Sequence, residues 1–329
     1  MKSKVILSIL VILTAFALPF LLLPGAESEP SEPEPMESTE PTAAESTQAP
    51  EPEASFDGGL ILRVETPEGI REMPLHDYLV GVVLAEMPTD FAAEALKAQA
   101  VASRTYALRK AEGRKHTGAD VCGSYACCQA WTPKEEYENT EALQKAEDAV
   151  TQTDGLVVTY DGSLIDATFF SCAGGMTEAA AAVWGSDVPY LQAVESPEHE
   201  EKYEDCVTIG AQEFAETIRS VHPEAELDGE PAEWFAEQRR TVGGGLDTVQ
   251  IGGVTVHGTE LRKLFSLRST DMTITTSDGA VTIRTSGYGH RVGLSQYGAD
   301  ALAEEGEDFE QILLHYYQGT EVKRLHMEE

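Results

Sequence analysis

The stretch YLVGVVLAEMPTDF, residues 78–91, places one carboxylate, Glu86, at the end of an apolar run and just before Pro88. Four apolar residues on the preceding turns recur at helical spacing: Leu75, Leu79, Val82 and Val83. Proline disfavours helical geometry in the residue before it. The sequence therefore predicts a helix that has Glu86 in its last turn, on the same face as the apolar residues.

Two effects are expected to raise the pKa of the Glu86 carboxyl group. The side chains of Val82, Val83 and Met87 keep water away from it, and the negative end of the helix dipole lies beside it. A carboxylic acid that is still protonated near neutral pH is the group needed to protonate a glycosidic oxygen. A helix-end acid that points into water is the alternative, and this stretch alone leaves both open.

The composition limits the partners of the chain. Its 329 residues contain 57 Asp and Glu against 23 Lys and Arg, a formal net charge of -34. Binding to phosphate groups needs basic patches, so this charge argues against nucleic acid or anionic lipid as a partner. It is compatible with a glycan.

The N-terminus predicts a membrane anchor over residues 1–25. Lys2 and Lys4 precede an uncharged apolar run, residues 5–23, that is long enough to span a bilayer. The lysines are expected to stay in the cytoplasm. We therefore expect a single-pass protein of the cell membrane with its remainder outside the cytoplasm. A cleaved signal peptide is the competing interpretation.

Residues 26–59 are rich in Glu, Pro, Ser and Thr and contain no Lys or Arg. Such a segment has too little apolar surface to fold, so we expect a disordered acidic linker. Residues 60–66, LILRVET, then alternate as a strand does, and a turn at residues 67–69 leads to a second short strand.

The segment DFAAEALKAQAVASRTYALRKAEG, residues 90–113, predicts a long helix capped by Asp90 and ending at Gly113. The sequence EMPTDFAAEALKAQAVASRTYAL, residues 86–108, resembles the signature of the stage II sporulation protein D family, which includes the amidase-enhancer proteins. Three further segments match in the same order: SCAGGMTE (171–178), WGSDVPYLQAVESPEHE (184–200) and GYGHRVGLSQYGADALAEEGEDFEQILLHYYQGTEV (287–322).

The resemblance implies a peptidoglycan lytic transglycosylase with Glu86 as the catalytic acid and then base. Such an enzyme cleaves the bond between N-acetylmuramic acid and N-acetylglucosamine and leaves a 1,6-anhydro end, with no cofactor for catalysis. It also implies a role in endospore engulfment, glycan strands lacking stem peptides as substrate, and a complex with a cell-wall amidase and a further membrane protein. A glycan-binding amidase enhancer without catalysis, a hydrolytic muramidase and a zinc hydrolase are the alternatives.

The resemblance also implies a set of substrate-binding residues: Lys97, Arg104, Thr177, Tyr190, His290, Gln296 and Tyr297. Lys97 and Arg104 lie seven residues apart and therefore share a helix face. A surface salt bridge is the alternative for Arg104 and a place in the core is the alternative for Tyr190. Two positions depart from the family. Arg291 stands where glycine is usual and is expected to narrow the cleft or to add a substrate contact, and His199 stands where an acid is frequent.

His116, Cys122, Cys127 and Cys128 lie within thirteen residues and can close a tetrahedral zinc site. The resemblance implies the same, because some family members bind zinc at this spacing, with a histidine in place of Cys127. A fully ligated site of this kind is structural. Disulfides are the alternative in an exported domain. The two remaining cysteines, Cys172 and Cys206, could form one.

The chain is expected to have an α+β fold with a mixed core domain and an inserted smaller subdomain. The core takes residues 60–206 and 271–329, and the inserted α/β subdomain takes residues 207–270. The subdomain begins with a helix within residues 209–227 and continues with a hairpin turned at Gly252 and Gly253, a short helix and a strand. A simple extension of one core is the alternative.

Overall fold

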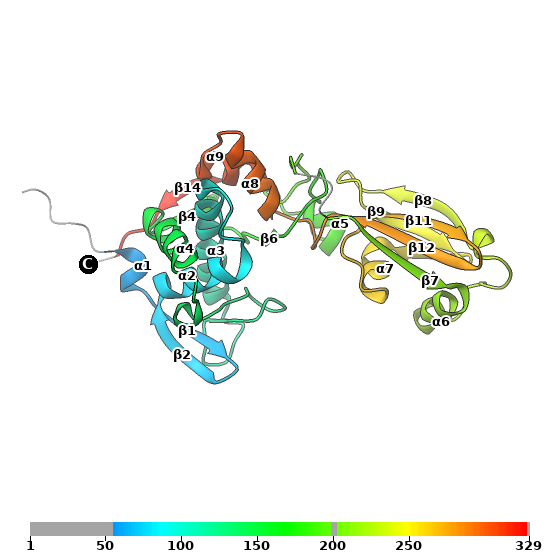
Figure 1. The fold of residues 1–329 in the computed structure, drawn as a ribbon, viewed down its shortest axis with the longest axis horizontal. Helices are drawn as coiled ribbons and strands as arrows, with labels where there is room; N and C mark the ends of the chain where they lie inside the picture. Colours follow the sequence, from blue (N-terminus) through cyan, green and yellow to red (C-terminus); the bar gives the residue numbers. More distant parts are fainter. Residues whose placement is uncertain (1–54, 199–202, 328–329) are drawn as a thin grey trace, which may run out of the picture. The chain divides into compact units, whose positions relative to one another are not determined.

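The computed structural model describes residues 55–198 and 203–327, drawn in Figure 1. Within them the chain is a mixed α+β protein, as expected. No helix in these two ranges is long and apolar enough to cross a membrane. The anchor expected over residues 1–25 lies outside the described residues.

The first core is built largely from helices. These helices are α1 (Phe56–Gly59), α2 (Leu75–Glu86), α3 (Ala93–Gly113), α4 (Thr140–Gln152), α5 (Ala180–Trp184), α8 (Gln296–Glu304) and α9 (Phe309–Tyr316). α3 contacts α2, α4, α8 and α9. Its buried alanines, among them Ala98 and Ala102, let these neighbours approach closely. α3 is thus the central helix of the core (Figure 1).

Three small sheets complete this core. They contain β1 (Ile61–Thr66), β2 (Gly69–Pro74) and β3 (Val121–Cys122), then β4 (Leu156–Tyr160), β5 (Ser163–Leu164) and β14 (Glu321–Arg324), and finally β6 (Phe169–Phe170) and β13 (Leu294–Ser295). β1 and β2 form the predicted antiparallel hairpin. β3 pairs in parallel with β1 and thereby brings the cysteine-containing loop beside the hairpin. A short 3-10 helix (Lys134–Glu136) precedes α4.

The two predicted helix ends are largely confirmed. α2 ends at Glu86 because Met87, before Pro88, is extended with φ −126° and ψ 135°. α3 ends at Gly113 as expected. The prediction that Asp90 caps α3 is wrong: the helix begins at Ala93, and the backbone N–H of Ala92 donates to the Asp300 carboxylate at 2.8 Å. A side chain distant in sequence satisfies this N–H group.

A second group of buried apolar residues forms a separate cluster, which we call the inserted lobe and which spans residues 205–286. It contains β7 (Asp205–Gly210), α6 (Ala211–Val221), a 3-10 helix (Pro231–Glu233), β8 (Phe235–Arg240), β9 (Leu246–Ile251), β10 (Val254–His257), α7 (Gly258–Leu264), β11 (Asp271–Ser277) and β12 (Ala280–Ser286). The hairpin at Gly252 and Gly253 is confirmed.

The lobe extends beyond the predicted bounds of 207–270. β12 pairs with β11 on one side and with β7 on the other, and all three are antiparallel neighbours. Residues 271–286, assigned to the core domain from the sequence, therefore belong to the lobe's sheet. The pairing of β7 with β12, which are more than sixty residues apart in the chain, sets this boundary, and local sequence patterns do not show such a pairing.

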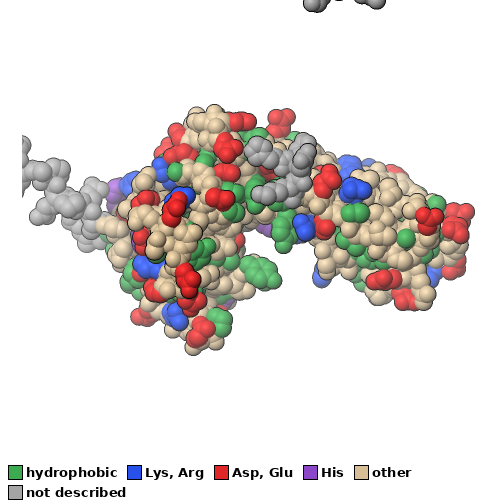
Figure 2. Space-filling view, viewed as in Figure 1, with side chains coloured by type: hydrophobic (Ala, Val, Ile, Leu, Met, Phe, Trp, Pro, Cys, Tyr) green, Lys and Arg blue, Asp and Glu red, His purple; other side chains and the backbone are tan. Residues whose placement is uncertain are grey.

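The predicted linker boundary at residue 59 is also wrong. α1 (Phe56–Gly59) is part of the folded core, and the side chain of Asp57 is completely buried. Ser55 caps this helix through a hydrogen bond from Gly58. Acidic side chains are scattered over the face of the protein shown in Figure 2, in keeping with the net charge of -34.

Candidate active site

A cavity of about 770 Å³ lies at the end of α2. Its walls come from several elements: Glu86 from α2, Tyr106 from α3, the loop after β3, the strand β6, Trp184 at the end of α5, and the loop between β12 and β13. Among the described residues that line it, Glu86 carries the only carboxylate. Aromatic side chains make up much of the remaining wall.

The carboxyl group of Glu86 has a raised pKa, as the sequence predicts. Loss of water on burial is the larger effect and raises the pKa. The backbone N–H of Ala130 donates to Oε1 at 2.5 Å, stabilises the ionised form and opposes part of that rise. The described residues supply no hydrogen-bond partner to Oε2. The carboxyl group is therefore held in place by one oxygen, and the other is available to a ligand.

Gln296 contributes an amide group to the same cavity. It is the first residue of α8, and its Nε2 donates to Oε1 of Gln99 on α3 at 3.3 Å. Gln99 in turn donates to Ser103 at 2.9 Å. This chain of side-chain hydrogen bonds fixes the orientation of the Gln296 amide, because each amide can satisfy its neighbour in one orientation only.

His290 lines the cavity as a neutral aromatic ring. Burial and the nearby positive charge of Arg262 lower its pKa to about 4. Its Nδ1 accepts a hydrogen bond from the Val292 backbone at 3.1 Å. The ring lies 5.6 Å from Phe170 and 5.3 Å from Trp184 between centroids. At neutral pH His290 therefore carries no charge and contributes wall surface to the cavity.

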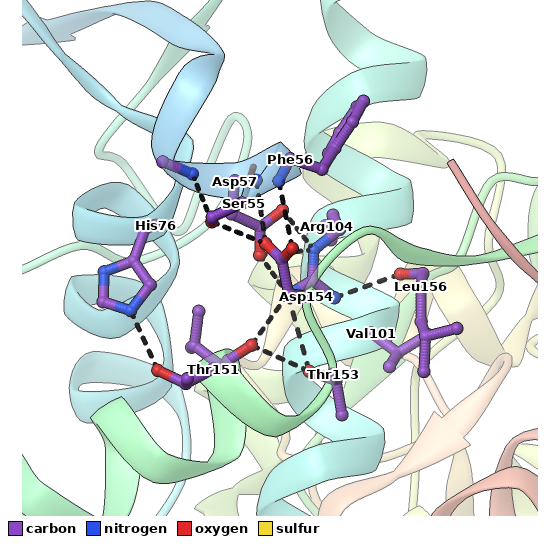
Figure 3. Close-up of polar contacts among 12 residues, drawn as sticks. Ser55, Phe56, Asp57, His76, Val101, Arg104, Thr151, Thr153, Asp154 and Leu156 are labelled. Carbon is purple, nitrogen blue, oxygen red and sulfur yellow. Dashed lines mark hydrogen bonds and ion pairs between the residues drawn. The ribbon is translucent and has the colours of Figure 1, made fainter. Parts of the chain in front are cut away.

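Arg104 does not reach the cavity. It is completely buried, and its Nη2 and Nε contact the carboxylate of Asp57 in α1 at 2.5 and 2.8 Å (Figure 3). Its Nη1 donates to the carbonyl of Leu156 at 3.0 Å. The implied substrate contact is wrong for this residue, and so is the surface salt bridge that was its alternative. Arg104 joins α3 to the N-terminal end of the folded core.

Four more of the implied substrate-binding residues lie outside the cavity lining: Lys97, Thr177, Tyr190 and Tyr297. Lys97 pairs with Glu94 at 2.7 Å and lines a separate small pocket. The buried Thr177 accepts a hydrogen bond from the Val194 backbone at 2.8 Å. Of the seven implied residues, His290 and Gln296 line the cavity that contains Glu86.

The aromatic rings of Tyr190 and Tyr297 pack against neighbouring aromatic side chains. The hydroxyl of Tyr190 accepts from the Asp166 backbone at 3.1 Å, and its ring lies 5.5 Å from Tyr160. This is the core position that was the alternative for Tyr190. The ring of Tyr297 packs between Phe91, at 4.7 Å, and Tyr203, at 4.4 Å.

Arg291 has a backbone φ of +64°, in the left-handed region that favours glycine. Its side chain is buried, donates to the carbonyls of Ala173 and Gly243, and pairs with Glu178 at 3.4 Å. The expectation that it narrows the cleft or contacts substrate is therefore wrong. Because Gly243 belongs to the inserted lobe, Arg291 ties the core to that lobe. His199 lies outside the described residues.

The four predicted metal ligands come together. One ligand atom from each of His116, Cys122, Cys127 and Cys128 lies within 4.8 Å of the others. A zinc ion with bonds of about 2.3 Å to sulfur would draw tetrahedral ligands to about 3.8 Å from one another, so the set fits zinc. Nδ1 of His116 lies 3.0 Å from the Glu65 carboxylate, which can orient the ring for Nε2 ligation.

The possible disulfide between Cys172 and Cys206 is not formed. Cys172 is buried, and its thiol donates to the Glu198 carboxylate at 2.6 Å. Burial raises the pKa of this thiol. Cys206 is exposed on β7 in the inserted lobe. Glu198 also accepts from Ser295 at 2.5 Å, so it holds together two loops that border the cavity.

Local sequence patterns do not mark several aromatic residues of the cavity wall: Tyr106, Tyr125, Phe170, Trp184 and Tyr288. Trp184 and Tyr288 are 47% and 50% exposed. Both lie in the segments WGSD and GYGH that carry the resemblance. Exposed aromatic residues beside glycine in matched segments were the available signal for a ligand-facing wall.

Comparison with known proteins identifies relatives of this chain. A family model described as "Stage II sporulation protein" matches residues 65–160. Stage II sporulation protein D of Bacillus subtilis (strain 168) is 35% identical over 266 residues, which cover 78% of this chain and 76% of that protein. The protein of the same name from Bacillus amyloliquefaciens is 36% identical and covers 77% of this chain and 75% of its own length.

The amidase enhancer of Bacillus subtilis (strain 168) is 30% identical over 296 residues, 74% of this chain and 40% of that protein. The resemblance found in the sequence is thus confirmed over most of the chain. The chain belongs to the stage II sporulation protein D family.

Proposed function

We propose that this protein is a lytic transglycosylase that cleaves peptidoglycan glycan strands between N-acetylmuramic acid and N-acetylglucosamine. The observation that carries the proposal is Glu86: its pKa is raised, its Oε2 is available, and the described cavity wall holds no second carboxylate. Hydrolysis of a glycosidic bond normally uses two carboxyl groups at a set distance. A single carboxyl group suits a reaction in which the substrate supplies its own nucleophile.

The proposed reaction uses Glu86 twice. The protonated carboxyl group first donates its proton to the oxygen that leaves C1 of the muramic acid residue, which acquires oxocarbenium-ion character as that bond breaks. The C6 hydroxyl of the same sugar then forms a bond to C1 and transfers its proton to the Glu86 carboxylate. The products are a 1,6-anhydro end and a free 4-hydroxyl on the N-acetylglucosamine. No water is consumed, and Glu86 regains its proton.

The rest of the wall supports this chemistry by orientation and exclusion of water. The amide of Gln296 is fixed by Gln99 and can hydrogen-bond sugar hydroxyl or acetamido groups. His290 stays neutral, so it does not compete with Glu86 as a proton donor. The aromatic rings beside it provide apolar surface against which sugar faces pack.

We assign the four ligands His116, Cys122, Cys127 and Cys128 to a structural zinc ion. With four protein ligands the metal would have no open position to activate water. It would hold in place the loop that carries Ala130 and the cavity residues Cys127 and Cys128. This assignment leaves the acid–base chemistry to Glu86.

We base the proposed setting of the reaction on the family. The relatives' names refer to stage II sporulation and to amidase enhancement. We propose that this chain acts in endospore engulfment from the outer side of the cell membrane, held by its N-terminal segment. Its substrate would be strands stripped of stem peptides by a partner amidase. That amidase and a further membrane protein would be its partners.

The test is digestion of peptide-free glycan strands by the purified full-length protein, followed by mass spectrometry. Wild type and the matched variant Glu112→Gln, which removes an exposed carboxylate at the end of α3, are expected to produce 1,6-anhydro ends. Glu86→Gln is expected to lose about 10²–10⁴-fold in rate, the usual contribution of general acid–base catalysis. Reducing ends would indicate a muramidase. Absence of cleavage, with amidase stimulation retained, would indicate an enhancer.

A further inference from the structure

Gly81 lies in the middle of α2, five residues before Glu86, and is the only glycine of that helix. It is buried. Glycine in the interior of a helix is less stable than alanine, because it loses more conformational freedom on folding. The backbone of Gly81 does not have a positive φ, so alanine would fit its conformation. The reason for a glycine here therefore lies in what packs against the helix.

Residues 130–134 form a segment that packs against this glycine. A Cβ atom at position 81 would overlap the carbonyl oxygen of Thr132 and Nε1 of Trp131. The backbone N–H of Thr132 donates to the Gly81 carbonyl at 3.2 Å, which holds the segment in this close contact. Rotation of a side chain cannot relieve an overlap with a backbone oxygen. An alanine at position 81 would therefore push the segment away from α2.

Two further contacts join the same segment to α2. At the start of the segment, the backbone N–H of Ala130 donates to Oε1 of Glu86 at 2.5 Å. At its end, Nζ of Lys134 pairs with the Asp77 carboxylate at 2.8 Å. The segment thus follows the helix backwards, from its last residue to its first turn. Gly81 lies between these two contacts, so a displacement at Gly81 acts on the contact with Glu86.

We propose that Gly81 is a positioning residue for Glu86: it leaves room for the segment 130–134 against α2, so that the backbone N–H of Ala130 reaches Oε1 of the carboxyl group. The proposal rests on the proposed function, since it takes Glu86 to be the catalytic acid. The hydrogen bond holds one oxygen of the carboxyl group and leaves the other to the substrate. A catalytic group that is displaced by about 1 Å can lose about 100-fold in rate.

The same hydrogen bond favours the ionised form of Glu86 and opposes the effect of burial on its pKa. The other titratable side chains of the cavity wall come from α3, from the loop after β3 and from the loop between β12 and β13: Tyr106, Tyr125, Cys127, Cys128, Tyr288 and His290. Among the described residues, none of these six forms a hydrogen bond with Glu86. The N–H of Ala130 is therefore the contact that a displaced segment would remove.

The test compares the pH profile of cleavage of peptide-free glycan strands by full-length wild type and Gly81→Ala. The fall in kcat/KM with rising pH is expected to move to higher pH in the variant, because the carboxyl group loses the N–H that favours its ionised form. The maximal kcat is expected to fall about tenfold or more. Gly113→Ala is the matched control: its methyl group, on the last residue of α3, meets no neighbouring element in the described part of the chain. It is expected to keep the wild-type profile.

A second variant and a second measurement accompany this test. Ala130→Pro removes the N–H group itself and keeps Gly81, so it is expected to move the pH profile in the same direction. Hydrogen exchange followed by mass spectrometry reports on the segment without any substrate. In Gly81→Ala the amides of residues 130–134 are expected to exchange faster than in wild type. The amides of the inserted lobe are expected to exchange at the wild-type rate, which also shows that the variant is folded.

The proposal is overturned if either Gly81→Ala or Ala130→Pro keeps the wild-type pH profile. It is also overturned if Gly81→Ala does not fold or exchanges faster throughout, because the glycine would then serve the whole core. These outcomes are separate from the failure of the proposed function. Cleavage by wild type with an unmoved profile leaves the enzyme and removes the role of Gly81. Faster exchange confined to residues 130–134, without cleavage by wild type, leaves the placement of the segment by Gly81 and removes the enzyme.

Discussion

The backbone N–H of Ala130 and the carboxylate of Glu86 are joined by a hydrogen bond of 2.5 Å. Ala130 follows Cys128 by two residues, so this bond links the end of α2 to the loop that carries the metal ligands. The bond stabilises the ionised carboxyl group, and burial disfavours it more strongly, so the net pKa of Glu86 is raised. The position of this backbone loop thus limits how far burial raises the pKa of Glu86.

The first prediction concerns the pH dependence of cleavage. Because only the protonated form of Glu86 can donate, kcat/KM for peptide-free strands is expected to fall as pH rises through the raised pKa. The ordinary value is 4.5, so the fall begins above that pH. A rate profile measured in buffers of constant ionic strength checks this. A fall centred at or below pH 4.5 would contradict the assignment of Glu86 as the acid.

The second prediction concerns the stability of Glu86→Gln. Because folding raises the pKa of this carboxyl group, its protonated form stabilises the fold. This stabilisation is fully present at pH values below the pKa of the unfolded state. It is lost as pH rises through the pKa of the folded state. Glutamine has no such loss. The variant is therefore expected to unfold at a higher temperature than wild type at pH 8 and at nearly the same temperature at pH 4. A lower melting temperature at pH 8 would argue against burial of this carboxyl group.

The third prediction concerns the metal. Chelation of a structural zinc ion is expected to lower the melting temperature and the cleavage rate together, because the metal then no longer holds the loop that positions Ala130. His116→Ala is expected to have the same effect and to reduce the metal content below one ion per chain. Cys206→Ser, which changes an exposed cysteine outside the cluster, is the matched control and is expected to alter neither. Activity lost with an unchanged melting temperature would instead indicate a catalytic metal.

The fourth prediction concerns the buried ion pair of Arg104 and Asp57. Arg104→Ala leaves the Asp57 carboxylate buried without a partner and is expected to lower the free energy of unfolding by about 3–5 kcal/mol. Arg109→Ala removes an arginine of the same helix whose pair with Glu112 is exposed, and its expected cost is about 0.5 kcal/mol. Urea unfolding of both variants measures the difference. Equal stabilities would mean that the pair contributes nothing to the fold.

A double variant separates the pair from the packing around it. Arg104→Met combined with Asp57→Leu removes both charges and keeps apolar volume, so it is expected to be more stable than Arg104→Ala alone. If the double variant is less stable than the single one, the hydrogen bonds to the carbonyls of Leu156 and Val150 matter more than the charges.

Local sequence patterns determined the features that depend on neighbours along the chain. The apolar spacing and Pro88 fixed the extent of α2, with Glu86 as its last residue. Four metal ligands within thirteen residues came together because the loop between them is short. The hairpin at Gly252 and Gly253 followed from its two-residue turn. Each of these arises from contacts within a few residues, where backbone geometry restricts the chain to a few conformations.

Only the tertiary structure decided which distant side chains meet. Shared helix spacing placed Lys97 and Arg104 on one face of α3, but the partner of Arg104 is 47 residues away in α1, in a segment expected to be disordered. Arg291 donates to the carbonyl of Gly243 in the inserted lobe although no local motif marks that contact. Ion-pair partners and cavity walls depend on packing between elements, and sequence periodicity shows which face of a helix is buried without showing what covers it.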